Sequence, residues 1–182
     1  RASGLGPGDR VLLRLGNTVD FPVAFLGAVA ADLVPVPTAA GLTEGEITRL
    51  ARFVAPAAIL AAPGIPLPDL PGVPVLTELA PMMEHAPGDI VPGDPDRLAY
   101  LVFTSGSSGE PKAVAHAHRA VWARRMMMEG WYGLTPEDRL LHAGAFNWTF
   151  TLGTGLLDPW AMGATALIPA PGVPVEALPL LL

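Results

Sequence analysis

Residues 100 to 112 combine side chains and backbone that could bind a polyphosphate. Strand-forming residues run from Tyr100 to Phe103 and lead into a stretch of hydroxyl side chains and glycines, which ends at Pro111 and Lys112. Glycines allow successive backbone N–H groups to turn toward one point, and serine and threonine hydroxyls add further donors. The lysine supplies a mobile positive charge. The combination indicates an enzyme that uses a nucleotide; a plain Ser/Gly turn between two strands is the alternative.

Two common nucleotide-binding patterns do not fit this stretch. The Walker pattern is Gly-x-x-x-x-Gly-Lys followed by Ser or Thr, whereas Gly106 and Gly109 are three positions apart and Ala113 follows the lysine. Pro111 also stands where the helix of a Walker loop should begin. The spacing of the dinucleotide-binding glycines fails here as well. A Walker-type kinase and a dehydrogenase are therefore disfavoured.

Residues 104–112 read Thr-Ser-Gly-Ser-Ser-Gly-Glu-Pro-Lys. This run closely resembles the phosphate-binding signature of the adenylate-forming superfamily, Thr-Ser-Gly-Thr-Thr-Gly-x-Pro-Lys-Gly. The two Ser-for-Thr exchanges keep the hydroxyl donors, and Ala113 replaces the final glycine. His118 matches a histidine that follows the signature, and we expect it to open the next helix without a catalytic role. The resemblance implies that the ATP phosphates are bound by Thr104, Ser105, Gly106, Ser107, Ser108, Gly109 and Lys112.

A second segment, residues 140–150, is rich in aromatic side chains and precedes a Gly-Ala-Thr at position 163. In the superfamily an aromatic motif at this place lines the acyl pocket. Trp148 falls on the residue that lies beside the carboxylate and the ATP phosphates, and Phe146 and Asn147 flank it. A flat aromatic wall would offer apolar surface and exclude water. The alternative is that these aromatics are ordinary core residues, which is our expectation for Phe150.

The resemblance implies activation of a carboxylic acid by Mg2+-ATP to an acyl-adenylate, followed by transfer to coenzyme A. The sequence of residues 147–155 resembles benzoate- and acyl-CoA ligases more than amino-acid-activating domains, so the expected acid is fatty or aromatic. Lys112 is the only lysine, and the superfamily's adenylation lysine and downstream motifs have no counterpart. We therefore expect an N-terminal fragment without a catalytic residue, inactive alone. Two alternatives stay open: a non-catalytic nucleotide-binding remnant, and an adenylation domain that loads a carrier protein.

Composition excludes several other classes. The formal net charge of −6 argues against a nucleic-acid partner. The chain has no cysteine and four scattered histidines, so we expect neither disulfides nor a metal site of its own, and a cytoplasmic location. Apolar runs are interrupted well short of the ~20 residues that span a membrane. The expected partners are a small carboxylate, ATP, CoA and the remainder of the same protein.

Strand-like and helix-like segments alternate along the chain. Strands are expected at 10–15, 33–37, 57–61, 98–103 and 164–168, and helices at 19–31, 43–54, 118–132 and 151–160. Thr43 and Glu46 have the spacing of a capping box at the start of the second helix. The third helix offers Val121, Trp122, Met126 and Met127 for a core face. The alternation predicts an α/β fold with parallel crossovers. The resemblance implies the layered αβαβα N-terminal domain of adenylate-forming enzymes, incomplete here, with mostly parallel sheets. We divide it into first α/β units (1–61), a Pro-rich connection (62–97), and a phosphate-loop and acyl-pocket segment (98–182). Asn17 and Phe21 match scaffold positions to which we assign no chemistry.

Overall fold

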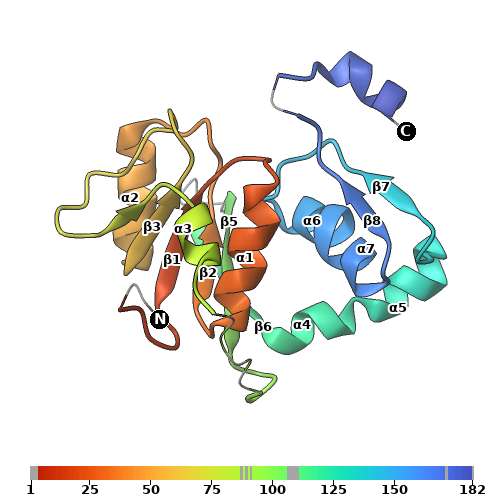
Figure 1. The fold of residues 1–182 in the computed structure, drawn as a ribbon, viewed down its shortest axis with the longest axis horizontal. Coiled ribbons are helices and arrows are strands. Elements are labelled where there is room, and N and C mark those ends of the chain that lie inside the picture. The colour runs from red at the N-terminus through yellow and green to blue at the C-terminus, as the bar shows by residue number, and fades with distance from the viewer. Residues whose placement is uncertain are drawn as a thin grey trace.

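The first half of the chain forms a parallel sheet with helices on both faces (Figure 1). The computed structural model describes residues 4–86, 88, 90, 92–105, 111–170 and 172–181. The strand order is β2-β1-β3-β4. These strands are β1 (Arg10–Arg14), β2 (Val34–Pro37), β3 (Ala58–Ala61) and β4 (Val75–Leu76). β1 pairs in parallel with both β2 and β3, which confirms the expected crossovers.

Alternation along β1 divides the core between the two faces of this sheet. Leu13 packs with Phe21 and Phe25 in one cluster, whereas Leu12 packs with Ile47 in the other. Successive strand residues point to opposite faces, so the first helix covers one face and the second covers the other. The helices of this half are α1 (Asp20–Ala30), α2 (Glu44–Val54) and α3 (Ala80–Met83).

The predicted start of α2 is confirmed. The Glu46 N–H donates to Thr43 Oγ1 (3.4 Å), and the Thr43 N–H donates to Glu46 Oε2 (2.9 Å). This reciprocal capping box satisfies backbone donors that a helix otherwise leaves unpaired at its first turn. It fixes where α2 begins after the loop that follows β2.

An antiparallel hairpin follows the Pro-rich connection. It consists of β5 (Leu98–Ser105) and β6 (Pro111–Ala117). β5 lies beside β2, and its Tyr100 and Val102 join the α1 cluster while Leu101 joins the α2 cluster. The hairpin thus extends the layered core, although its own pairing is antiparallel in a fold expected to be mostly parallel.

The remaining elements form a second group beside α1 (Figure 1). β7 and β8 pair in parallel, and Leu152 and Leu156 pack into the α1 cluster. The elements are α4 (His118–Ala123), α5 (Arg125–Met127), a π-helical turn (Met128–Tyr132), β7 (Arg139–Leu141), α6 (Thr149–Leu152), a π-helical turn (Gly153–Leu157), α7 (Asp158–Ala161), β8 (Thr165–Leu167) and a 3-10 helix (Val175–Leu181).

The segment expected as one helix at 118–132 is helical but broken at Arg124. The sequence offered Val121, Trp122, Met126 and Met127 for its core face. Trp122 and Met126 are wrong because both are strongly exposed, whereas Val121 packs against the α1 cluster. Arg124 and Met128 also face inward. Arg124 reaches the fully buried Asp158, and this ion pair sets the face that the helix turns inward.

Within the described residues, no helix combines the length and apolar character needed to cross a membrane.

Candidate functional site

The described strands of the β5–β6 hairpin bring two predicted site residues together. Thr104 and Lys112 are Cα partners in the β5–β6 ladder, and Ser105 pairs with Pro111. Directly opposed residues of an antiparallel pair project to the same face, so the hydroxyl and the ammonium share one side of the hairpin. Four predicted phosphate ligands, Gly106, Ser107, Ser108 and Gly109, lie outside the described residues, and only the backbone of Ser105 is described.

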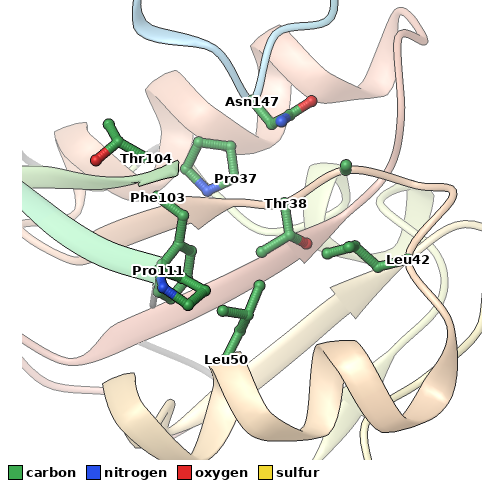
Figure 2. Close-up of a pocket in the computed structure, with 9 residues that line it drawn as sticks. Pro37, Thr38, Leu42, Leu50, Phe103, Thr104, Pro111 and Asn147 are labelled. Atoms are coloured by element: carbon green, nitrogen blue, oxygen red, sulfur yellow. The ribbon is translucent and has the colours of Figure 1, made fainter. Parts of the chain in front are cut away.

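A shallow pocket of about 170 Å³ lies beside the end of this hairpin that carries Thr104 and Pro111 (Figure 2). Its polar lining comes from Thr38, Thr104 and Asn147, on three separate segments of the chain. Thr38 follows the carboxyl end of β2, and Thr104 lies near the carboxyl end of β5. Ligands of α/β sheets bind at the carboxyl ends of strands. The rest of the lining is mostly apolar: Pro37, Ala39, Leu42, Leu50, Phe103 and Pro111.

Arg14, at the end of β1, holds the wall of this pocket from inside. Its fully buried guanidinium donates to the carbonyls of Ala39, Ala40 (3.2 Å), Leu42 (3.3 Å) and Pro66 (2.9 Å). Burial lowers the pKa of Arg14. Arg14 was not predicted as a site residue from the sequence, although a charged side chain within the apolar run of β1 is a detectable signal.

The aromatic segment separates into a buried residue and exposed ones. Phe146 is buried and stacks on Phe21 with 5.0 Å between ring centroids. Asn147 lines the pocket, whereas Trp148 is 65% exposed. The structure therefore brings Asn147 to Thr104 but places Phe146 in the core. Phe150 was expected in the core, and this is wrong because it is 62% exposed.

Asn17 joins this segment to the end of β1. Its Nδ2 donates to the Gly144 carbonyl (2.8 Å), and its Oδ1 accepts from the Phe146 N–H (3.0 Å). The sequence identified Asn17 as scaffold, and nothing in its local surroundings revealed a partner so distant along the chain.

His118 occupies the first position of α4, as expected, and its N–H donates to the Arg97 carbonyl (3.2 Å). Burial, reinforced by the charge of Arg97, lowers its pKa. Among the described residues, no group of three or more His, Cys, Asp or Glu side chains could hold a metal ion.

Comparison of the sequence with known proteins identifies a family and several relatives of this chain. Residues 1–181 match the family described as "AMP-binding enzyme". Benzoate–CoA ligase of Thauera aromatica is 30% identical over 198 residues, covering 96% of this chain and 37% of that protein. The p-hydroxybenzoic acid–AMP ligase FadD22 of Mycobacterium tuberculosis (strain H37Rv) is 31% identical over 187 residues, covering 100% of this chain and 26% of that protein.

The fold also matches that of a solved structure. The nonribosomal peptide synthetase FmoA3 is 27% identical to this chain, with a TM-score of 0.80 over 96% of this chain and 19% of that chain. The chain thus spans well under half the length of each of these three proteins.

Proposed function

Because this chain belongs to the AMP-binding enzyme family, we propose that it is part of the N-terminal AMP-binding domain of a longer carboxylic acid–thiol ligase. That parent enzyme would convert a fatty or aromatic acid to its acyl-adenylate with ATP, and would then transfer the acyl group to coenzyme A. Since the chain spans 37% of the benzoate–CoA ligase that it resembles, the complete reaction is proposed for the parent and not for this chain alone.

One observation carries the proposal: Thr104 and Lys112 oppose each other at the base of the Gly/Ser stretch, beside the pocket that Asn147 lines. The pairing directs a hydroxyl donor and a cation to one face. Both groups suit phosphate oxygens, since an ammonium and a hydroxyl can each donate to them. The mostly apolar pocket next to them suits the body of an organic acid.

In the first half-reaction, a carboxylate oxygen forms a bond to the α-phosphorus of ATP. The bond between that phosphorus and the bridging oxygen breaks, and pyrophosphate leaves with the bond's electrons. Lys112 would offset part of the charge on the leaving group, and Thr104 would donate to one of its oxygens. Positioning and electrostatic stabilisation supply most of the rate enhancement in such transfers.

In the second half-reaction, the thiolate of coenzyme A attacks the acyl carbon, and AMP leaves with the oxygen that linked it to the acyl group. We propose that residues of the parent outside this chain supply the adenylation lysine, because Lys112 is the only lysine present and already serves the phosphates. Mg2+ would enter with ATP, bound by its phosphate oxygens.

The relatives differ in the reaction that their names give for the activated acid. One is named as a CoA ligase, one as an AMP ligase, and one is a nonribosomal peptide synthetase. The observation in favour of coenzyme A is the match to benzoate–CoA ligase over 96% of this chain. The alternatives are loading of a carrier protein and a nucleotide-binding remnant without activity.

We also propose the division of the chain at residues 61 and 97, and a cytoplasmic location, where ATP and coenzyme A are available. The coding sequence that surrounds this chain would help to distinguish the ligase from the nucleotide-binding remnant. A downstream lysine-bearing domain would support the ligase, whereas its absence would favour the remnant.

The test is Lys112→Met in the parent enzyme, assayed by carboxylate-dependent exchange of pyrophosphate into ATP. We expect a loss of about 100-fold in the exchange rate, within the range for one electrostatic group at a transition state, with little change in carboxylate affinity. Arg119→Met is the matched control, because Arg119 is an exposed cation just beyond β6 that pairs with Asp96 (2.6 Å). Equal exchange rates in the Lys112 variant and the wild type would overturn the proposed phosphate site.

A further inference from the structure

We propose that Asn17 is a positioning residue, which sets the orientation of Asn147 and Trp148 and so the alignment of the bound carboxylate. The inference rests on the proposed function, because it concerns the acyl side of the same site. Asn17 itself does not line the pocket. It would act through the backbone of residues 144–146, which we call the clamp segment.

Two hydrogen bonds of opposite sense tie Asn17 to the clamp segment. The side-chain amide donates to the Gly144 carbonyl at 2.8 Å and accepts from the Phe146 N–H at 3.0 Å. A carboxamide offers both a donor and an acceptor on one planar group, whereas an ionised carboxylate only accepts. The two bonds therefore fix both the distance and the rotation of the segment, and they require a carboxamide side chain.

The side chain of Phe146 provides a second anchor at the same place. It stacks on Phe21, four positions beyond Asn17, with an angle of 22° between the ring planes. The start of α1 thus holds the backbone of residue 146 through Asn17 and its ring through Phe21. The next residue, Asn147, lines the pocket (Figure 2). Any rotation of residue 146 would be passed directly to Asn147 and Trp148.

Tight packing behind the clamp segment leaves it few other conformations. A Cβ on Gly144 would collide with Oγ1 of the buried Thr151, and a Cβ on Gly155 would lie 2.7 Å from the Cβ of His142. The Gly144 N–H also donates to His142 Nδ1 (3.1 Å). Glycine at these positions lets the backbone come close to the neighbouring side chains. The clamp segment is therefore confined from behind by His142 and Thr151, and from the front by Asn17.

The position of Asn17 in the turn after β1 explains how the clamp is built. Gly16 has φ of 64°, a left-handed conformation that favours glycine. This turn carries the chain from β1 to α1 and directs Asn17 toward the clamp segment. Arg14, the last residue of β1, bonds the carbonyls of Ala39, Ala40 and Leu42, and Ala39 and Leu42 line the same pocket as Asn147. The end of β1 and the turn after it thus support two segments of the pocket lining.

The test compares Asn17→Ala with Thr18→Ala in the parent enzyme. Thr18 is the matched control, because its hydroxyl donates to the Leu15 carbonyl (3.4 Å) within the same turn. The assay is carboxylate-dependent pyrophosphate exchange, with KM measured separately for the carboxylate and for ATP. We expect Asn17→Ala to raise the carboxylate KM by about tenfold, as for a lost pair of partly buried hydrogen bonds, and to leave the ATP KM within about twofold.

Two further measurements separate positioning from simple destabilisation. Hydrogen exchange at the Phe146 amide should be faster in Asn17→Ala than in Thr18→Ala, because that amide loses its acceptor. Asn17→Asp should restore the slower exchange of that amide but not the carboxylate KM, since a carboxylate cannot donate to the Gly144 carbonyl.

Failure of the inference and failure of the proposed function give different results. If the wild type is active and Asn17→Ala lowers only the melting temperature, with both KM values unchanged, Asn17 is structural and the inference is overturned. If the wild type shows no exchange with any fatty or aromatic acid, the proposed function itself is overturned, and the positioning role fails with it.

Discussion

Arg124 and Asp158 form a bidentate ion pair that joins α4–α5 to α7. Arg124 Nε donates to Asp158 Oδ1 at 2.7 Å, and Nη2 donates to Oδ2 at 2.6 Å. The Asp158 side chain is fully buried, and its hydrogen bonds raise the pKa of Arg124. Gly153 leaves room for the guanidinium, because a Cβ there would collide with it. A buried ion pair with this geometry specifies how the two segments dock.

Asp158→Asn should lower the free energy of unfolding of the parent enzyme by about 3 kcal/mol, because it leaves the Arg124 charge without its counterion in a largely buried place. Urea unfolding at neutral pH measures the change. Glu129→Gln is the control, since the Arg125–Glu129 pair (3.2 Å) is exposed and should contribute less than about 1 kcal/mol. If both variants lost the same stability, the buried pair would have no special role.

Arg14→Met should also destabilise the parent, by about 3 kcal/mol, because several backbone carbonyls around the pocket lose their only described side-chain donor. Methionine preserves much of the volume, so the effect reports hydrogen bonding more than a cavity. Besides urea unfolding, limited proteolysis near residues 39–42 should be faster in the variant. An unchanged cleavage rate there would show that Arg14 does not hold the pocket wall.

Acid should destabilise the fold partly through His116. This side chain stacks on Tyr100 with ring centroids 4.5 Å apart, and burial lowers its pKa below the usual value of about 6.5. Below about pH 6.5, the unfolded chain binds a proton at His116 that the folded chain does not yet bind. The free energy of unfolding therefore decreases as the pH falls, until the pH passes the lower pKa of His116 in the folded state. His118, whose pKa is also lowered, contributes to this loss of stability in acid in the same way.

His116→Phe should flatten this dependence, because phenylalanine keeps a ring on Tyr100 but does not titrate. The free energy of unfolding is compared between about pH 7.5 and about pH 5 for the variant and the wild type. Parallel curves for the two proteins would mean that other groups cause the acid sensitivity.

Local features of this fold were predictable from the sequence, whereas distant pairings were not. The capping box of α2 and the strand leading to Ser105 depend on neighbours within a few residues, so their residue types predicted them. Asn17 and Phe146 are 129 positions apart. A hydrogen bond between residues so far apart cannot be predicted from the spacing of residue types, because a polar side chain that follows a strand can equally well face solvent.

The inward face of residues 118–132 was predicted wrongly in part, for the same reason. Hydrophobicity offered Trp122 and Met126 alongside Val121 and Met127, but Arg124 bonds to Asp158, 34 positions away, and Trp122 and Met126 face outward. Local apolar character therefore predicted the helix and not its orientation. The proposed phosphate-binding stretch was found because it resembles a contiguous signature, whereas the pocket beside its described ends depends on segments from β2, β5 and residue 147.

Trp148 offers the last test, because it is exposed while its neighbour Asn147 lines the pocket. If Trp148 borders the acyl site, Trp148→Ala in the parent should raise the carboxylate KM by about tenfold, since the acid loses an apolar wall, and should leave the ATP KM nearly unchanged. Phe150→Ala is the matched control: Phe150 is similarly exposed, but it contacts the His142 ring edge-on, 5.4 Å between centroids. Because both changes remove an exposed aromatic from one segment, a general loss of stability would affect them alike. Equal carboxylate KM values in the two variants would remove Trp148 from the acyl pocket.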